Sequence, residues 1–570
     1  MRVLHHSTTQ LPEGCALARP SRAGAWLQVA ATLVWLPQAA LIAWSIAAVQ
    51  AGRPFADLVQ AAVAFVLLGL VRSGLEAAGI RRSFASARAY TQALRMQALA
   101  ALAQRSPLDA ERPAAGTVAS VLNEQSDPIT PYHARYTTAR TKVMVVPLFI
   151  LLGVAWYSWV AALVLLVAAP LIPLFMALVG WRAEAASRQH LHQIGELNQF
   201  LLDRIQGLAS IRGLGGVAQV TEQLARTADL LRNNTMAVLK IAFLSSAVLE
   251  LFSALGVALV AVYVGFHLLG QLPFGSWGGQ LSLAQAMWVL LLSPAFFEPL
   301  RELSAVWHDK AAGVAGEAAL QSLQAPGKHF VGSAEASVAE QATAACTVEL
   351  EGISYRYNSR LPLVVEDLDI RIAAGERVAL WGSSGSGKST VMALIAGLAA
   401  PTAGQIRVAG QAMDDEHANA LRASMAWVSQ KPHLFAASLK ENIRLGRAIA
   451  ESHVQAAIDS VALGDVLRQR GNAVIGDGGL GLSGGEALRL TLARAAVHPH
   501  CALILADEPT AHLDAETATF VRESLLALAA RGATLIVATH DPLLAALMDR
   551  VVSLDGSTPM AVDAEQKEIA

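Results

Sequence analysis

The sequence predicts two joined parts, a membrane α-helical domain of about six transmembrane helices and an α/β domain built around a phosphate-binding loop. Of its 570 residues, 54% are hydrophobic and 15% are charged, whereas an ordinary soluble domain carries about 25% charged residues. Most of the apolar excess lies before residue 305, which points to the membrane. After residue 345 the apolar residues alternate, which predicts strands. A net charge of −2 gives no indication of a nucleic-acid partner.

Six apolar segments are candidate spans, because a helix that crosses the hydrocarbon core needs about 20 apolar residues. They cover residues 24–49, 55–79, 143–157, 160–180, 242–267 and 283–303. The third is short, and the sequence from Tyr157 to Trp159 leaves room for a tight corner before the fourth. The apolar run after Arg22 exceeds the 7–15 residues of a cleavable signal, so we expect this first span to be retained.

Basic residues predict the orientation of these spans. The segment Arg81–Lys142 holds nine Lys or Arg and the segment Trp181–Lys240 holds seven, while the three short loops on the other face contain only Arg53. Positive charge stays on the cytoplasmic side. Both long connections and the α/β domain are therefore predicted to be cytoplasmic, in a multi-pass membrane protein.

The two long connections are predicted to be helical continuations of the spans. Arg81–Gln104 and Glu184–Asp203 lack proline and are rich in helix-forming residues, and such extensions reach about 30 Å beyond the bilayer. Turns are expected at Ser106-Pro107 and near Gly213–Gly216. These helices would act as levers between the two domains, with a merely solvated stalk as the alternative.

The predicted order of domains follows from these shifts in composition. It comprises a cytoplasmic N-terminus (1–23), the transmembrane domain (24–323), a linker rich in Ala, Ser, Gly and Gln (324–345), the α/β domain (346–560) and a tail (561–570). Cys15, Cys346 and Cys501 lie far apart without Cys-x-x-Cys or Cys/His spacing, which indicates neither a disulfide framework nor a zinc site.

A phosphate-binding motif opens the α/β domain. The short apolar strand Arg377–Trp381 leads into the loop Gly382-Ser-Ser-Gly-Ser-Gly-Lys388-Ser389-Thr390 and then into a helix. Glycines let backbone N–H groups converge on phosphate oxygens, and the helix N-terminus favours negative charge. Lys388 would reach the β- and γ-phosphates of ATP, and Ser389 would offer a hydroxyl to Mg²⁺.

An acidic pair and a histidine end two later strands. The buried-strand pattern Ala502–Ala506 is followed by Asp507 and Glu508, which can respectively hold Mg²⁺ through water and orient or deprotonate the attacking water. The strand from Thr534 to Ala538 is followed by His540, placed to contact the γ-phosphate. Taken alone, this histidine would be an ordinary strand-end residue, but its spacing after the acidic pair favours a functional role.

Two further segments are not needed by a general phosphate-loop enzyme. Gln430 closes the strand-like sequence SMAWVSQ, and LSGGE runs from Leu482 to Glu486 into a helix. A glycine turn before a helix is a second N-terminus suited to phosphate. These segments, with GSSGSGKST, LILADE, the AHLD that ends at Asp514, and His540, resemble the ATP-binding-cassette (ABC) family in order and spacing.

That resemblance implies a sandwich in which two cassettes enclose two ATP molecules. Glu508, His540 and Gln430 would be catalytic, and Ser389, Gln430 and Asp507 would hold Mg²⁺, with Gln430 linking the metal to the membrane half. Tyr357 would stack on adenine, with Tyr355 as the second candidate. The full set of nucleotide-contacting residues would be Tyr357, Gly382, Ser383, Ser384, Gly385, Ser386, Gly387, Lys388, Ser389, Thr390, Asp507, Asp514 and, on the partner's ATP, Ser483, Gly484 and Gly485.

The signature sequence departs from the family pattern at one position. It ends in Glu486 where the family usually has Gln. Because Ser483, Gly484 and Gly485 are intact, the expected consequence is weakened or retuned activity at the partner's ATP. Glu508 is present, so the chain's own site is expected to hydrolyse ATP.

The membrane half resembles ABC exporters, which fuse such spans ahead of the cassette. Stretches such as LDRIQGLASIRGLG and LLSPAFFEPLRELSAVWHDKAAGVAGEA resemble the D subunit of the bacterial heterodimeric exporter associated with cysteine and glutathione export and cytochrome bd assembly. The resemblance implies a second half-transporter as partner and a small-molecule thiol as cargo, with haem as a competing substrate or ligand. A homodimeric lipid or peptide exporter shares the architecture, whereas the spans argue against a soluble ABC ATPase.

Polar residues inside the spans are the independent clues to cargo. Arg72 and Glu76 lie one turn apart in the second span, where a charge usually faces a cavity or pairs with another. The alternative is an ion pair that stabilises the helix. His308, at the end of the last span, could ligate haem iron or serve structure. The spans hold no Cys/Met/His cluster that would favour a metal pump.

Overall fold

The computed structural model describes residues 20–170, 204, 207–272, 274–332, 345–358, 360–430, 432–471, 473–475, 482–498 and 501–555. The chain divides into two compact units. Unit 1 comprises residues 1–99 and 115–324, and unit 2 comprises residues 100–114 and 325–570. Cys15, the extension Glu184–Asp203, the end of the fourth span, most of the linker and the tail lie outside the described residues.

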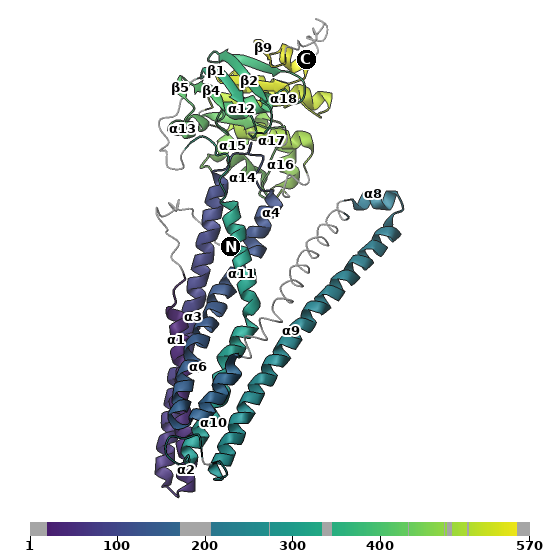
Figure 1. Ribbon diagram of the computed structural model, residues 1–570. Coiled ribbons are helices and arrows are strands. Elements are labelled where there is room, and N and C mark those ends of the chain that lie inside the picture. Colours follow the sequence, from purple (N-terminus) through teal and green to yellow (C-terminus); the bar gives the residue numbers. More distant parts are fainter. Residues whose placement is uncertain are drawn as a thin grey trace. The chain divides into compact units, whose positions relative to one another are not determined.

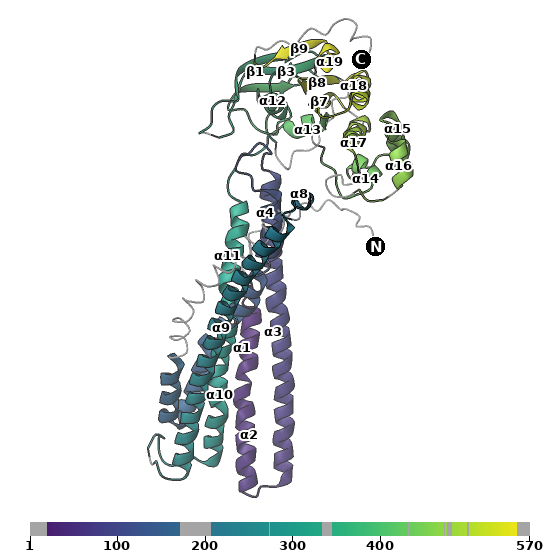
Figure 2. The same ribbon diagram turned by 90° about the vertical axis from the view of Figure 1, so that its right-hand side faces the viewer.

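The regular elements of unit 1 are all helices in the part that the structure describes, and Figures 1 and 2 show several of them as long helices. Its elements are α1 (Ala23–Leu33), α2 (Trp35–Gln50), α3 (Phe55–Ala103), α4 (Ala115–Ser120), η1 (Val121–Gln125), α5 (Ile129–Pro131), η2 (Tyr132–Tyr136), α6 (Thr137–Tyr157), α8 (Leu208–Gly213), α9 (Val217–Leu268), α10 (Leu283–Ala305) and α11 (Trp307–Leu323). η1 and η2 are single π-helical turns.

Five of the described helical segments are long and apolar enough to cross a membrane, as the hydropathy pattern predicts. They are Ala23–Gln50, Phe55–Ala103, Ala115–Tyr157, Ala247–Leu268 and Leu283–Leu323, and the shorter apolar helix Trp159–Pro170 marks the start of the fourth predicted span. The predicted tight corner is confirmed, since Ser158 alone is extended between α6 and this helix. Its hydroxyl bonds the Tyr263 hydroxyl at 3.0 Å and donates to the carbonyl of Gly275 at 2.8 Å.

The predicted helical extension of the second span is confirmed. α3 continues without a break from Phe55 to Ala103 and ends just before the predicted turn at Ser106-Pro107. The turn near Gly213–Gly216 also forms, because α8 ends at Gly213 and α9 begins at Val217. The first span is broken once, at Val34 between α1 and α2, where Pro37 has no N–H to donate to the carbonyl of Leu33.

Small residues let α1 pack closely on α3. A Cβ at Gly24 would come within 2.7 Å of the carbonyl oxygen of Gly79, and a Cβ at Gly79 within 2.9 Å of that of Gly24. Such close backbone approach is typical of membrane helices. Elsewhere in unit 1 the core is apolar; its fully buried members include Val146, Ile150, Val260, Leu292 and Phe297.

Unit 2 contains two sheets with helices around them. The antiparallel sheet has the order β2-β1-β4-β5 and the parallel sheet the order β6-β7-β8-β3-β9. The strands are β1 (Val348–Tyr355), β2 (Val365–Ile372), β3 (Arg377–Trp381), β4 (Ala403–Val408), β5 (Gln411–Ala412), β6 (Met425–Val428), β7 (Leu503–Asp507), β8 (Thr534–Thr539) and β9 (Arg550–Ser553). The helices are α12 (Lys388–Ile395), α13 (Ala418–Arg422), α14 (Leu439–Arg444), α15 (Glu451–Ser460), α16 (Gly464–Arg470), α17 (Gly484–Ala496), α18 (Ala515–Ala529) and α19 (Pro542–Ala546).

The central strands of the parallel sheet are apolar on both faces, as expected for a sheet covered by helices. Every residue of β8 is buried, and so are Leu503–Ala506 of β7. Because β3, β7 and β8 are parallel neighbours, their carboxyl ends meet at one edge. The phosphate loop follows β3, Asp507 ends β7 and His540 follows β8, so the register of the sheet brings the predicted site together.

The turn after α3 belongs to unit 2, a feature that the composition did not indicate. Arg105 and Asp109 form an ion pair at 2.6 Å with side chains only 6% and 7% exposed. The Ser106 hydroxyl donates to the carbonyl of Leu398, and the Ser106 N–H donates to that of Lys328 at 2.7 Å. Residues 100–114 are thus fixed to the α/β unit by buried polar contacts.

Candidate functional site

The loop between β3 and α12 has the backbone that a phosphate cradle needs. Gly385 and Gly387 have φ of +88° and +90°, in the left-handed region where side chains are disfavoured. A Cβ at Gly387 would also come within 3.1 Å of the Val364 carbonyl oxygen. Gly387 is the N-cap of α12, so the first N–H groups of that helix face the loop without a side-chain cap.

Lys388 is held inside this loop. Its side chain is 5% exposed, and its Nζ donates to the carbonyls of Gly382 at 2.8 Å and Ser383 at 2.9 Å. Sequence reasoning missed one contact, since the Ser383 N–H donates to the Asp555 carboxylate at 2.7 Å. Asp555 follows β9, and no motif marks it; its position depends on the pairing of β9 with β3.

A hydroxyl and a carboxylate meet beside the loop, as predicted for Mg²⁺. The Ser389 Oγ donates to Asp507 Oδ1 at 2.9 Å. Burial raises the pKa of Asp507, an effect that the Ser389 hydrogen bond opposes and the neighbouring Glu508 reinforces. A half-buried carboxylate beside a hydroxyl fits a site for a divalent ion, because oxygen donors are those that Mg²⁺ prefers. Ser389, Asp507 and the amide oxygen of Gln430 would hold it.

Glu508 is the centre of the polar groups at this edge. Gln430 Nε2 donates to its Oε2 at 2.8 Å, His540 Nδ1 lies 3.4 Å from its Oε1, and Lys388 Nζ lies 3.9 Å from the same oxygen. Its backbone has φ of +44°, which is strained for a residue other than glycine. The structure thus brings together the three predicted catalytic residues, which come from three different segments.

Of the two tyrosines considered for adenine, the structure favours Tyr357. Tyr355 is 0% exposed in the core, and burial raises its pKa to about 12. Tyr357 is half-buried, and its hydroxyl bonds Thr390 Oγ1 at 2.8 Å. This bond ties the tyrosine to α12, directly after the phosphate loop, and leaves its ring partly accessible.

The turn before α17 is capped by its own helix. Ser483 is the N-cap; its hydroxyl accepts from the N–H of Glu486 at 3.3 Å, and the Glu486 carboxylate accepts from the N–H of Ser483 at 2.7 Å. This reciprocal pair is a capping box. The residue that departs from the family pattern therefore has a local structural partner.

The two glycines of this turn differ in what requires them. A Cβ at Gly485 would come within 2.8 Å of the Thr517 methyl group of α18, whereas a Cβ at Gly484 would meet nothing within 4 Å. Gly484 is also exposed. Packing explains Gly485 but not Gly484. Asp514 caps α18 by accepting from the N–H and hydroxyl of Thr517, and these bonds lower its pKa.

The predicted cargo residues in unit 1 do not converge. The Arg72 guanidinium lies over the ring of Trp35 at 5.7 Å, and Glu76 is exposed. Among the ion pairs of the described residues, Arg72 and Glu76 are not partners. His308 is exposed in the first turn of α11. No group of three or more His, Cys, Asp or Glu that could hold a metal occurs in the described part of the chain.

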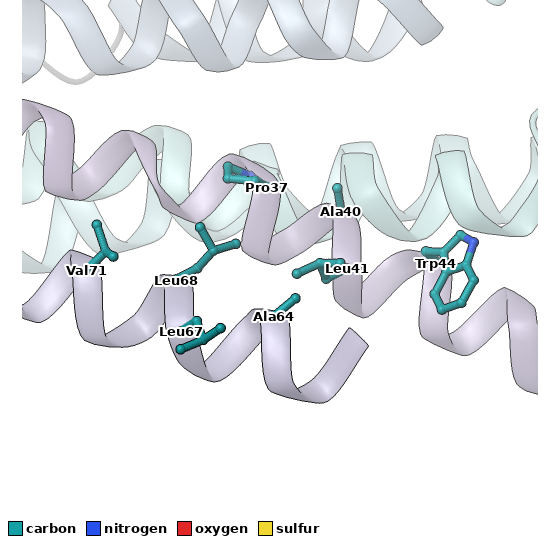
Figure 3. A pocket seen from close by; sticks show the side chains of 8 residues that line it. All are labelled: Pro37, Ala40, Leu41, Trp44, Ala64, Leu67, Leu68 and Val71. Atoms are coloured by element: carbon teal, nitrogen blue, oxygen red, sulfur yellow. The ribbon is translucent and has the colours of Figure 1, made fainter. Parts of the chain in front are cut away.

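A groove of about 680 Å³ lies between α2 and α3, and Figure 3 shows its lining. It is lined by Pro37, Ala40, Leu41, Trp44, Ala64, Leu67, Leu68 and Val71. Every lining side chain is apolar or mainly so, and both helices are candidate spans. The groove offers no charged group to fix a polar cargo.

Comparisons with known proteins find a separate family model for each half of the chain. A model described as the ABC transporter matches residues 365–511, and one described as the ABC transporter transmembrane region matches residues 27–289. The chain is similar to the "Glutathione/L-cysteine transport system ATP-binding/permease protein CydD" of Escherichia coli K12, with 37% identity over 79% of this chain and 76% of that protein. It is also similar to the "Transport ATP-binding protein AarD" of Providencia stuartii, with 34% identity over 89% and 84%.

A solved structure has the same fold. A bacterial Atm1-family ABC exporter with ATP bound matches with a TM-score of 0.70 and 22% identity, covering 93% of this chain and 92% of that one. The predicted fold class, a helical membrane domain of the ABC exporter type fused to an ATP-binding cassette, is thus confirmed. The chain belongs to the ABC transporter family, in the CydD group of exporters, and is a multi-pass membrane ATPase whose cytoplasmic cassette drives transport.

Proposed function

We propose that the chain is one subunit of a dimeric exporter that moves cysteine and glutathione-type thiols out of the cytoplasm, across the bacterial inner membrane, in support of cytochrome bd assembly. The cargo assignment is supported by relatives named for glutathione/L-cysteine transport. The ATPase assignment depends most on the Glu508 carboxylate, which lies between Gln430, His540 and Lys388.

Each residue of that cluster has a role in the proposed hydrolysis. Lys388 neutralises the β- and γ-phosphates, and Ser389, Asp507 and Gln430 hold Mg²⁺, which balances the negative charge of the phosphates. Glu508 orients or deprotonates the attacking water, and His540 contacts the γ-phosphate. The ring of Tyr357 stacks on adenine.

The partner is proposed to be a second half-transporter of the same family. A relative with 28% identity over 89% of this chain is the CydC protein of Bacillus subtilis, also named for glutathione/L-cysteine transport. In the dimer, Ser483, Gly484 and Gly485 contact the ATP bound by the partner. The glycine at position 484, which packing inside this chain does not require, supports that assignment.

Inside-out membrane vesicles test this proposal. Vesicles that contain the chain and its co-encoded partner should accumulate labelled cysteine or glutathione when ATP is added, and a Lys388→Ala variant should not. Accumulation of haem but not thiols would show that haem is the cargo. No accumulation of either would contradict the export assignment.

Two substitutions separate the competing cargoes. If Arg72 and Glu76 line the cargo pathway, Arg72→Ala should abolish stimulation of ATP hydrolysis by glutathione and weaken stimulation by haem, because both carry carboxylates that need a cation in a low-dielectric cavity. His308→Ala is expected to affect haem alone, through lost iron ligation. If Arg72→Ala lowers thermal stability without changing stimulation, the residue serves packing against Trp35.

A further inference from the structure

Three charged side chains in two membrane helices form an open cluster. Arg301 and Glu298 lie on α10, and Glu250 lies on α9. Within α10, Arg301 Nη2 donates to Glu298 Oε2 at 2.7 Å, whereas between the helices Arg301 Nη1 lies 3.4 Å from both carboxylate oxygens of Glu250. The contact within the helix is tight and the contact between helices is loose. We refer to these three residues as the Arg301 cluster.

The cluster lies deep along both helices. Arg301 is 18 residues from Leu283, where α10 begins, and Glu250 is 18 residues from Leu268, where α9 ends. At 1.5 Å per residue each lies about 27 Å from the loop that joins the two helices. The hydrocarbon core is about 30 Å thick. The three charges therefore share one level, near the cytoplasmic edge of the hydrocarbon.

The side chains of this cluster are accessible. Glu298 and Glu250 are 64% and 66% exposed, and Arg301 is 31% exposed. Near the edge of the hydrocarbon, charged side chains reach water or pair with one another. With two carboxylates and one guanidinium, the cluster retains one negative charge after pairing. Arg301 Nε is buried, and no acceptor for it is found among the described residues.

A neighbouring ion pair shows what a purely structural contact looks like. Lys142 of α6 donates to both oxygens of Glu302 of α10 at 2.9 and 3.0 Å. The Lys142 side chain is 9% exposed and that of Glu302 is 39% exposed, and the pair is balanced in charge. It joins two helices through a close two-oxygen contact. The Arg301 cluster differs in the greater exposure of its carboxylates, in its loose contact between helices and in its unbalanced charge.

We propose that the Arg301 cluster binds the α-amino acid head group of the exported compound. Arg301 binds the α-carboxylate with its fork of N–H donors. Glu250 separates from Arg301 and, with Glu298, binds the α-ammonium. A zwitterion matches one guanidinium beside two carboxylates, whereas a simple anion would face the unpaired carboxylate. Cysteine and the γ-glutamyl end of glutathione both carry this head group, so the inference rests on the proposed function.

The test uses ATP hydrolysis by the reconstituted transporter, containing this chain and its partner. Three thiols are compared: cysteine, cysteamine, which lacks the carboxylate, and 3-mercaptopropionate, which lacks the ammonium. With the unmodified chain, we expect the concentration of cysteine that gives half-maximal stimulation of ATP hydrolysis to be at least tenfold lower than that of either truncated thiol. Arg301→Gln should raise that concentration for cysteine at least tenfold and change it little for cysteamine. Glu250→Gln should raise the concentration of cysteine needed for stimulation and lower the concentration of 3-mercaptopropionate needed for it.

Matched variants separate binding from folding. Arg232→Gln removes an exposed arginine of α9 that is paired with Asp229 at 3.4 Å, three residues away, and should leave the order of the three thiols unchanged. Arg301→Lys keeps the charge without the fork and should restore part of the response to cysteine. Thermal unfolding of each variant checks its fold.

Two results would overturn the inference in distinguishable ways. Equal stimulation by the three thiols in the unmodified transporter, or an equal loss of all three responses in Arg301→Gln, rejects head-group binding and leaves the proposed thiol export standing. A transporter that responds to no thiol rejects the proposed cargo and the inference with it.

Discussion

At the N-terminus of α12, Lys388 is 5% exposed and its ammonium folds back on two loop carbonyls. At the N-terminus of α17, Ser483 is exposed and shares a capping box with Glu486. The first N-terminus has cations and carboxylates of its own chain around it, and its helix has no side-chain cap. At the second, the capping box satisfies the N–H groups of Ser483 and Glu486, and the exposed Gly484 follows the cap.

This difference extends to the nearby carboxylates. Burial raises the pKa of Asp507, beside the phosphate loop, whereas the N–H and hydroxyl of Thr517 lower the pKa of Asp514, in the cap next to the α17 turn. The phosphate loop is built for a ligand that brings its own charge and metal. The α17 turn is already stable without one. The comparison therefore favours one complete site and one half-site, completed by another chain.

The largest expected effect is on the chemistry at the complete site. Glu508→Gln should lower ATP hydrolysis by about 10²–10⁴-fold, because a positioned base contributes that much. The amide can still bond Gln430, so ATP affinity should change little. Phosphate release and nucleotide binding measure the two effects, and a trapped ATP-bound dimer should appear in sizing experiments. Hydrolysis near the unmodified rate would mean that the chemistry occurs at the partner's site.

The half-site is tested at Gly484. Gly484→Asp should leave the cassette folded, because its Cβ meets nothing within 4 Å and an acidic residue is favourable in the first turn of a helix. A carboxylate there would repel the partner's phosphates and lower turnover about tenfold or more, toward the 10²-fold typical of losing one stabilising donor. ATP binding to this chain alone should be unchanged.

Gly484→Ala is the control for that substitution. It adds a Cβ without charge, so its effect on turnover should be several-fold smaller than that of the aspartate. If both variants hydrolyse ATP at the unmodified rate, the α17 turn does not contact nucleotide and the half-site interpretation is wrong.

A smaller effect is expected at Glu486. Glu486→Gln keeps the capping box, since Gln serves at this position as well as Glu. It also removes a negative charge whose repulsion of the partner's phosphates is on the order of 1 kcal/mol in a solvated site. Turnover of the dimer should therefore rise about two- to fivefold. Unchanged or lower turnover would show that the carboxylate does not weaken contact with the partner's ATP.

The sequence alone predicted what depends on local pattern. Apolar runs located the spans, and the order strand, glycine loop and helix located Lys388 and Ser389. The ends of parallel strands are also predictable, which is why Asp507, Glu508 and His540 were found. The linker boundary and the domain limits remain predictions.

Contacts between distant segments were not predictable in the same way. Arg72 has Glu76 one turn away, yet its guanidinium lies on Trp35 of another helix. Asp555 reaches the phosphate loop through strand pairing. The Glu250–Arg301 contact joins residues 51 positions apart. Helix periodicity gives the face of a residue but not which helix covers it, so these contacts required the structure.

The smallest expected effect is on the stability of the folded chain, where the carboxylates of Asp507 and Asp514 should act in opposite directions. The folded-state pKa of Asp507 is raised, so its ionisation destabilises the folded protein: the cost is complete above the raised value, shrinks as pH falls through it and is gone below the unfolded-state pKa, about 3.9. The pKa of Asp514 is lowered, so its contribution is present above the unfolded-state pKa and is lost as pH falls through the lowered value.

Nucleotide-free Asp507→Asn should therefore be more stable than the unmodified chain at pH 7. We expect Tm to rise by about 2–4 °C, the shift that about 1 kcal/mol produces in a domain of this size, and the gain should shrink as pH falls. Asp514→Ala should lower Tm at pH 7, because the cap of α18 is lost. Scanning calorimetry with Mg²⁺ and ATP should reverse the order at position 507, since ligand binding stabilises the chain that holds the metal. If Asp507→Asn lowers Tm without ligand, the hydrogen bond from Ser389 stabilises the ionised carboxylate by more than burial destabilises it. The phosphate loop would then be stable without a ligand, like the α17 turn.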